Sequence, residues 1–204
     1  MQLTGGQFKG MKAASPEGAR STLSVVRESV FNILATRFGR VSRCDGGGGG
    51  DPSIEGQPSP TKAKHYAGTG DDFSGLRFLD GFSGSGIMAL EAASRGFEAV
   101  AIEKNPAVAR VTRENIREFG LKLIVCDFLK FRNEKFDVIY LDPPWDLDYG
   151  AIIASAAEKL TPEGVIICEH DRDLPPHNLK IIKEKKYGRT RLTVLGATFQ
   201  LEVF

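Results

Sequence analysis

The sequence is poor in cysteine and has no long apolar segment. Its 204 residues include three cysteines, Cys44, Cys126 and Cys168, which are far apart and form no CxxC pair. This pattern speaks against a disulfide framework and predicts free thiols in a reducing compartment. No apolar stretch approaches the ~20 residues of a membrane span, and residues 1–14 lack the apolar core of a signal peptide. We therefore expect a cytoplasmic protein with no membrane partner.

Histidine is equally scarce, which argues against a metal centre. The three histidines are spread along the chain, and we expect them to be structural or exposed. Asp142, Asp146 and Asp148 lie close together in one acidic loop, but without a histidine among them they support a cation site only weakly. We expect no metal ion and no catalytic histidine.

The net charge of +1 conceals an uneven distribution. Residues 1–40 carry six basic and two acidic side chains, and residues 177–204 carry the same numbers. Each end is therefore +4, while residues 41–176 total −7. Two basic ends beside an acidic body are compatible with a polyanionic partner such as nucleic acid. Ordinary solvated lysines would give the same pattern.

Composition divides the chain into three parts. Residues 1–40 predict a short hairpin and a helix near Ser21–Gly39, which together would form a small extension. Residues 41–74 break every periodicity, include five consecutive glycines at Gly46–Gly50, and predict a flexible insertion. Residues 75–204 contain regular apolar segments and predict the catalytic domain.

Strand-like and helix-like segments alternate from Gly75 onward. This alternation predicts an α/β domain with a doubly wound, mostly parallel sheet, in which ligands gather at the carboxyl ends of the strands. The last segments have no helix between them and predict an antiparallel terminal hairpin. The expected strands are 76–82, 99–103, 122–127, 136–141, 164–169, 179–186, 191–195 and a strand-like tail at 198–204, and the expected helices are 85–95, 107–119 and 149–159.

A glycine-rich turn, Gly81–Gly86, follows the first of these strands. Dinucleotide-binding enzymes and methyltransferases both use such a turn, because it lets a ligand approach backbone amides closely. Asp80, just before the turn, favours a methyltransferase, in which an acid commonly faces the amino-acid end of the cofactor. Glu103 can accept both ribose hydroxyls, with helix capping as the alternative. Asp127 with Phe128 can bind an adenine ring, although loop capping explains Asp127 equally well.

The stretch Asp142-Pro143-Pro144-Trp145 follows the fourth strand and distinguishes these two classes. A dehydrogenase has no use for it, whereas methylation of a planar exocyclic amine does. The Asp142 carboxylate and the Pro143 carbonyl can accept the two amine hydrogens, which leaves the nitrogen lone pair free to attack. Trp145 can hold the ring by stacking. The prolines fix the backbone and donate no hydrogen bond.

Further segments are shared with one known family. They are Gly5–Gly10, Val26–Leu34, Phe82–Gly86, Leu90–Gly96, Glu103–Lys104, Asp142–Trp145 and Tyr187–Leu192. In these segments the chain resembles the RsmD-type family of bacterial 16S ribosomal RNA guanine-N2 methyltransferases. The hairpin and the Val-Arg-Glu helix are the segments most particular to that family. The resemblance covers nearly the whole chain except 41–74.

The resemblance implies a class I S-adenosylmethionine-dependent methyltransferase fold. We expect the enzyme to be a monomer. The expected reaction transfers a methyl group from S-adenosylmethionine to the N2 amine of a guanine in 16S ribosomal RNA, within the small subunit or an assembly intermediate. Catalysis is expected from Asp142, Pro143, Pro144 and Trp145. The cofactor is expected on Asp80, Phe82, Ser83, Gly84, Gly86, Glu103, Lys104, Asp127 and Phe128, and the RNA on Lys9, Lys12, Arg20, Thr22 and Arg27.

Two alternatives stay open. The acid-Pro-Pro-aromatic element also serves N6-adenine methylation of DNA or RNA, although this chain has no room for a separate DNA-recognition domain. The second alternative is a ribosome-assembly factor without turnover. It is favoured by the stretch 21–25, where Ser-Thr-Leu-Ser-Val replaces the family's usual Pro-Thr-Thr-Asp-Arg.

Overall fold

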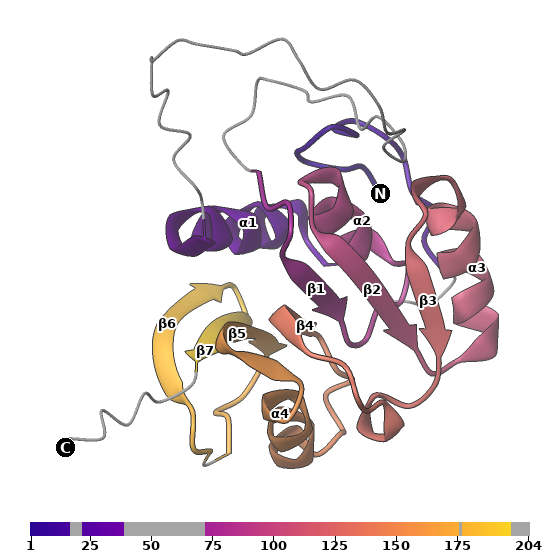
Figure 1. The fold of residues 1–204 in the computed structure, drawn as a ribbon. Coiled ribbons are helices and arrows are strands. Elements are labelled where there is room, and N and C mark those ends of the chain that lie inside the picture. The colour runs from indigo at the N-terminus through magenta and orange to yellow at the C-terminus, as the bar shows by residue number, and fades with distance from the viewer. Residues whose placement is uncertain (17–21, 39–71, 176, 197–204) are drawn as a thin grey trace, which may run out of the picture.

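The computed structural model describes residues 1–16, 22–38, 72–175 and 177–196 (Figure 1). Within these residues, a single seven-stranded sheet has the order β3-β2-β1-β4-β5-β7-β6. The five neighbouring strands β3, β2, β1, β4 and β5 pair in parallel, and β7 pairs antiparallel with both β5 and β6. The strands are β1 (Arg77–Asp80), β2 (Glu98–Glu103), β3 (Lys122–Val125), β4 (Phe136–Leu141), β5 (Leu160–His170), β6 (Lys180–Tyr187) and β7 (Thr190–Gly196).

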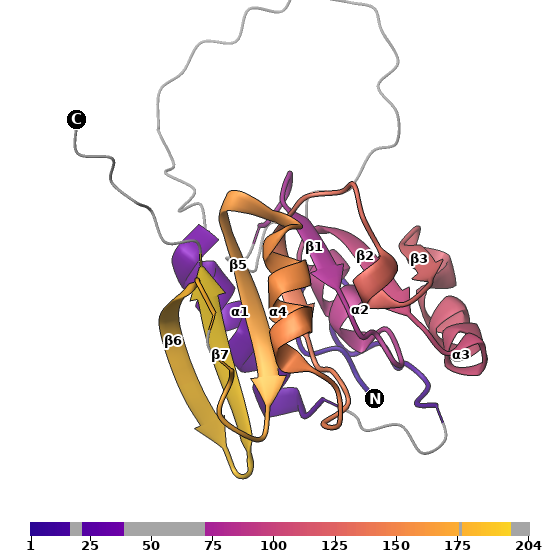
Figure 2. The same cartoon turned by 90° about the horizontal axis from the view of Figure 1, so that it is seen from below.

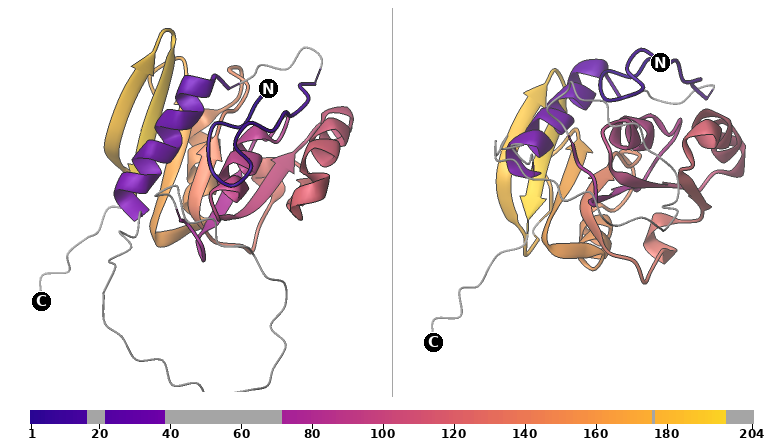
Figure 3. Two further views of the ribbon diagram at one scale, coloured as in Figure 1. Left: turned by 90° about the horizontal axis from the view of Figure 1, so that it is seen from above. Right: turned by 45° about the horizontal axis from the view of Figure 1, so that its top comes forward.

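Helices cover both faces of this sheet and form a three-layer structure. Figure 2 and the left panel of Figure 3 view the molecule from opposite sides, with α4 in front of the sheet in the former and α1 in front in the latter. The helices are α1 (Ser24–Phe38), α2 (Ile87–Ser94), α3 (Pro106–Ile116) and α4 (Tyr149–Ala157), with short 3-10 turns η1 (Arg117–Phe119) and η2 (Phe128–Lys130).

Alternation along the strands explains why the sheet needs both helix layers. Successive side chains of a strand point to opposite faces, so a strand that is apolar throughout must be covered twice. Val138 and Tyr140 pack with the α1 and α2 side, whereas Ile139 and Leu141 pack with the α4 side. The continuous apolar run in β4 therefore defines the middle layer of the fold.

The predicted fold class is confirmed, and the elements differ only at their ends. The sheet is mostly parallel with an antiparallel terminal hairpin, and β4 has the predicted bounds. Helix α1 begins at Ser24 rather than near Ser21, because the Leu23 carbonyl accepts the first helical amide bonds, from Val26 and Arg27. The predicted tail strand at 198–204 lies outside the described residues.

The chain before α1 forms the predicted hairpin-like extension. Gln2 and Lys12 form an antiparallel bridge, and the amide of Leu3 donates to the carbonyl of Met11 (2.9 Å). Most of the predicted insertion, 41–74, lies outside the described residues, so its flexibility and the three-part division stay predictions. Phe73, however, is buried and stacks on Phe97 with ring centroids 4.4 Å apart. The packed core therefore begins before Gly75.

A buried carboxylate, Glu91 of α2, joins the extension and α1 to the sheet layer. Its Oε1 accepts from Nε of Arg27 (3.1 Å) and from the amide of Thr4 (2.8 Å). Its Oε2 accepts from the guanidinium of Arg95 and from the hydroxyl of Thr4. The remaining nitrogens of Arg27 donate to the carbonyls of Thr22 (2.6 Å) and Gln2 (2.8 Å). All three charged side chains are almost fully buried.

Removing Glu91 should therefore strongly destabilise the fold. Glu91→Ala leaves two buried guanidinium groups without their counter-charge, and we expect the free energy of unfolding to fall by about 3–5 kcal/mol. The matched control is Glu98→Ala, which removes an exposed glutamate 3.6 Å from Arg77 and should change it by less than about 1 kcal/mol. Urea denaturation followed by circular dichroism measures both. Equal effects of the two substitutions would contradict the structural role given to the buried cluster of Glu91, Arg27 and Arg95.

Candidate active site

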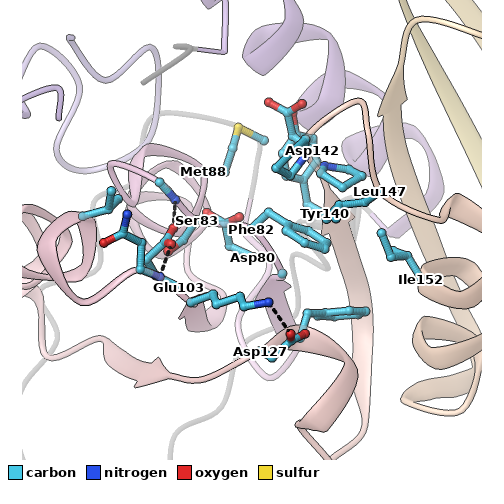
Figure 4. Close-up of a pocket in the computed structure, with 18 of the residues that line it drawn as sticks. Asp80, Phe82, Ser83, Met88, Glu103, Asp127, Tyr140, Asp142, Leu147 and Ile152 are labelled. Atoms are coloured by element: carbon cyan, nitrogen blue, oxygen red, sulfur yellow. Dashed lines mark hydrogen bonds and ion pairs between the residues drawn. The ribbon is translucent and has the colours of Figure 1, made fainter. Parts of the chain in front are cut away.

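A cleft of about 1090 Å³ opens at the carboxyl ends of β1, β2 and β4 (Figure 4). Parallel neighbours end at the same edge of a sheet, so residues distant in sequence meet there. All four predicted catalytic residues line this cleft. Every predicted cofactor residue lines it as well, except Gly86.

The glycine turn is held open by Glu103 and by α3. Glu103 Oε2 accepts from the amide of Gly84 (2.9 Å). Thr112 donates from its hydroxyl to the Gly84 carbonyl (2.6 Å), and Asn115 donates to the Ser85 carbonyl (2.8 Å). A Cβ placed on Gly84 would meet no atom within 4 Å, so open space faces the turn.

Gly86 supports the site from behind the cleft. It has a left-handed φ of 79° at the start of α2, a conformation that glycine adopts without strain. A Cβ at this position would lie 2.9 Å from Cγ2 of Thr112. The absence of a side chain thus lets α2 and α3 approach each other.

Asp80 lies at the floor of the cleft. Its carboxylate accepts from the amide of Ala89 in the first turn of α2 (3.2 Å) and so caps a helix whose N-cap residue, Gly86, has no side chain. Burial raises the pKa of Asp80 to about 8, and the nearby carboxylates of Asp142 and Glu103 raise it further against the opposing amide bonds. In the free protein at neutral pH this group is mostly protonated.

Asp127 both caps a loop and lines the cleft. Its side chain accepts from the amide of Leu129 (3.0 Å), which is the capping role left open above. Lys104 contacts it at 2.7 Å, and this ammonium is the main cause that lowers the pKa of Asp127. Phe128 is buried beneath it and packs against Phe82, with ring centroids 5.3 Å apart.

The loop after β4 carries Asp142 to Trp145. Pro143 is buried, whereas Pro144 is exposed and Trp145 is 39% exposed at the rim. The amide of Leu147 donates to the Pro144 carbonyl (3.2 Å) and closes the turn. Asp148 then accepts from the amides of Gly150 and Ala151 as the N-cap of α4. This capping role accounts for one of the three loop aspartates.

Negative charge is concentrated around Asp142. Burial raises the pKa of the Tyr140 phenol well above its usual range, and the carboxylates of Glu169 and Asp142 reinforce the effect. Burial likewise raises the pKa of the Cys168 thiol, with added contributions from the same two carboxylates. Burial and the neighbouring carboxylates therefore keep the Tyr140 phenol and the Cys168 thiol protonated.

The residues predicted to contact RNA do not lie together. Lys9 and Lys12 are exposed on the extension, Thr22 lines the cleft, and Arg20 lies outside the described residues. Arg27 is 4% exposed and engaged with Glu91. It therefore has a structural role and is no part of an RNA surface.

Sequence reasoning missed Tyr140, Met88 and Ile152, which line the cleft, and the contacts of α3 with the glycine turn. Tyr140 had a usable signal, because strand alternation places it on the same face as Asp142. Thr112 and Asn115 are three residues apart and so share a helix face. Nothing in the sequence indicates that this face of α3 contacts the glycine turn.

Within the described ranges, no group of histidine, cysteine, aspartate and glutamate is arranged to hold a metal ion, and no helix is both long and apolar enough to cross a membrane. Cys126 and Cys168 are free thiols, as predicted, but only Cys168 is buried, whereas Cys126 was also expected to be and is half-buried. His170 is buried, with Nε2 2.7 Å from the Thr193 hydroxyl, which fits a structural residue.

The chain is similar to several known proteins. It is 25% identical over 217 residues to the Bacillus subtilis protein named "Putative rRNA methyltransferase YlbH", with 95% of this chain and 97% of that protein aligned. It is 32% identical over 127 residues to "Ribosomal RNA small subunit methyltransferase D" of Haemophilus influenzae, covering 54% of this chain and 66% of that protein. Other curated relatives are matched over less, down to 27% of the length of one Methanocaldococcus jannaschii protein.

The solved structure of a hypothetical protein from Thermus thermophilus, TTHA0928, has the same fold. Its TM-score is 0.70 at 27% identity, with 97% of this chain and 99% of that chain superposed. A family model with the description "Conserved hypothetical protein 95" matches residues 61–196, more than half of the sequence. The shared fold, the relatives and this match together show that the chain belongs to the family described as Conserved hypothetical protein 95, which confirms its resemblance to RsmD-type proteins.

Proposed function

We propose that this protein transfers a methyl group from S-adenosylmethionine to the N2 amine of a guanine in 16S ribosomal RNA of the small subunit. One observation carries the proposal: a single cleft contains both the acids around the glycine turn and the Asp142–Trp145 element. The relatives' names support ribosomal RNA as the substrate class. The family resemblance supports guanine N2 as the acceptor.

The donor set of the cleft fits this cofactor. Asp80 suits the cationic amino-acid end, Glu103 suits the ribose hydroxyls, and the open space before Gly84 admits a ligand close to the backbone. Phe128 offers an apolar floor for the adenine ring, with Asp127 and Lys104 at its edge. When bound, S-adenosylmethionine would supply the activated methyl group of its sulfonium.

The residues of the β4 loop orient the acceptor amine. Asp142 and the Pro143 carbonyl accept its two hydrogens, and Trp145 packs against the base. The lone pair then points toward the methyl group, and positioning accounts for most of the rate. After transfer the nitrogen is cationic and acidic, so its proton passes to Asp142 or to water. No strong general base is required.

We propose that exposed basic residues of the β6–β7 hairpin dock the RNA. His170 at the end of β5 pairs with Arg191, and Arg191 pairs with Lys186. This register puts Lys186 level with the carboxyl end of β5, at the same sheet edge as the cleft. Lys186 and Arg189 are both exposed. Lys9 and Lys12 add positive charge on the extension. A folded RNA that presents a flipped-out guanine is expected to bridge these groups.

Replacing Asp142 should sharply lower turnover without loss of cofactor binding. In Asp142→Asn the negative charge is lost and one of the two acceptor oxygens becomes an NH2 donor, so we expect kcat to fall by roughly 100- to 1000-fold. The measurement is transfer of a labelled methyl group to small subunits isolated from cells that lack the protein. The control is Asp146→Asn, an exposed aspartate of the same loop outside the cleft, which should be near wild type. Full activity of Asp142→Asn would contradict the proposed chemistry.

Binding of the cofactor should release a proton from Asp80. The free carboxyl has a pKa of about 8 and is mostly protonated at pH 7, whereas a cationic ligand beside it favours the ionised form. Proton release means that affinity rises with pH up to about 8. Calorimetry at pH 7 in two buffers of different ionisation enthalpy measures this release. It should disappear in Asp80→Asn, and equal binding enthalpies for the wild type in both buffers would rule it out.

Charge reversal at the hairpin tip should weaken docking more than reversal elsewhere on the same strand. Lys186→Glu with Arg189→Glu should raise KM for small subunits and reduce its salt dependence, because phosphate contacts are lost. Lys180→Glu is the matched control, since Lys180 is exposed on the same strand but about 20 Å away at ~3.3 Å per residue. A larger effect of Lys180→Glu, or of reversal at Lys9 and Lys12, would place the RNA on another surface.

A further inference from the structure

One buried hydroxyl of the glycine turn has no hydrogen-bond partner. Ser83 is 6% exposed, and its Oγ bonds to no donor or acceptor among the described residues. The same residue lines the cleft (Figure 4). A buried hydroxyl in this state costs free energy, because folding removed its hydrogen bonds to water and replaced them with none. At the wall of a cleft, such a hydroxyl is available to a ligand.

The backbone around Ser83 is held in place. Its amide donates to the carbonyl of Ile102 (2.9 Å), and its carbonyl accepts from the amide of Gly86 (2.7 Å). The carbonyl of the next residue, Gly84, accepts from the hydroxyl of Thr112 (2.6 Å). The turn is therefore tied to β2, to the start of α2 and to α3. Within Ser83 itself, the hydroxyl is the polar group left for a ligand.

Ser83 lies between the two acids that we assign to different parts of the cofactor. Asp80, three residues earlier, is the last residue of β1 and suits the amino group of the amino-acid end. The carbonyl that binds the Ser83 amide belongs to Ile102, which directly precedes Glu103, the acid suited to the ribose. In S-adenosylmethionine the carboxylate and the amino group are attached to one carbon atom. A cofactor whose amino group meets Asp80 therefore brings its carboxylate to the same part of the cleft.

A carboxylate at this place needs a hydrogen-bond donor. Asp80 and Glu103 bind cationic groups and hydroxyls as acceptors, so neither serves a bound carboxylate. The other serine of the turn, Ser85, directs its hydroxyl to the sulfur of Met1 (3.9 Å). Among the described side chains of the turn, this leaves the Ser83 hydroxyl as the one whose proton is not engaged.

We propose that the Ser83 hydroxyl donates a hydrogen bond to the carboxylate of the methyl donor and thereby selects a donor that carries this group. The inference rests on the proposed function and deepens it, because it names the part of S-adenosylmethionine that one side chain recognises. Asp80 binds the amino group as an acceptor, and Ser83 binds the carboxylate as a donor. A hydroxyl suits this position because it supplies a proton without adding a charge that would pair with the neighbouring acids.

The test compares S-adenosylmethionine with decarboxylated S-adenosylmethionine, which keeps the adenosine, the sulfonium and the amino group but lacks the carboxylate. Calorimetry measures the Kd of each ligand for the wild type and for Ser83→Ala. The substitution should weaken binding of S-adenosylmethionine by about tenfold or more, as expected for the loss of a hydrogen bond to a charged group. It should leave the Kd of the decarboxylated ligand nearly unchanged.

Thermal unfolding of the free protein provides a second measurement that does not involve the cofactor. Ser83→Ala removes a buried hydroxyl without a partner, so the Tm of the free protein should be unchanged or higher. A residue that mattered only for the fold would instead lower the Tm and weaken both ligands equally. Ser83→Cys has a weaker donor of similar size and should fall between the wild type and Ser83→Ala. It carries the test if Ser83→Ala does not fold.

Two further variants serve as controls. Ser85→Ala removes the neighbouring hydroxyl of the same turn and should keep the wild-type ratio of the two Kd values. Asp80→Asn should weaken both ligands, because both carry the amino group, and this shared loss would show that they bind in the same cleft. If Asp80→Asn weakens neither ligand, the place given to the amino-acid end is wrong, and the role of Ser83 with it.

Two failures are distinguishable. If the wild type binds S-adenosylmethionine but Ser83→Ala weakens both ligands equally, or neither, the role given to the Ser83 hydroxyl is wrong and the proposed function stands. If the wild type does not bind S-adenosylmethionine, the proposed function itself is wrong.

Discussion

Glu91 is the constraint on which the arrangement of the site depends. It is a carboxylate buried in the centre of α2, and two buried guanidinium groups and the backbone of the extension all bind to it. Without Arg27 and Arg95, burying this charge would be very costly. The cluster therefore requires the extension, α1 and α2 to dock together. Through Arg27 the same cluster holds Thr22 in the cleft wall.

Topology then brings the remaining functional groups to one edge. Asp80 and Glu103 are the last residues of β1 and β2, and Asp142 follows β4. These three strands are adjacent in the sheet, although 62 positions of the chain separate Asp80 from Asp142. Mutual repulsion of the three carboxylates helps to raise the pKa of Asp80. A cleft that stores unfavourable negative charge gains stability when a cationic ligand enters.

Much of this could be predicted from the sequence, because it depends on local pattern. Strand periodicity, the glycine turn and the acid-Pro-Pro-aromatic element indicated the sheet, the cleft and its acids. Arg27 was wrongly expected at an RNA surface, since an arginine in a basic segment gives no sign that a glutamate 64 residues away will bury it. Tyr140 and Glu169 escaped notice because each looks like an ordinary strand residue. Only the pairing of β4 with β5 makes them partners.

The most direct test of the central claim is a map of the modified nucleotides in ribosomal RNA. Mass spectrometry should compare 16S RNA from cells with and without the gene, with the Asp142→Asn gene reintroduced as a further arm. The account predicts that one N2-methylguanosine disappears when the gene is removed and returns with the wild-type gene but not with Asp142→Asn. An unchanged set of modifications, or the loss of an N6-methyladenosine in its place, would contradict it.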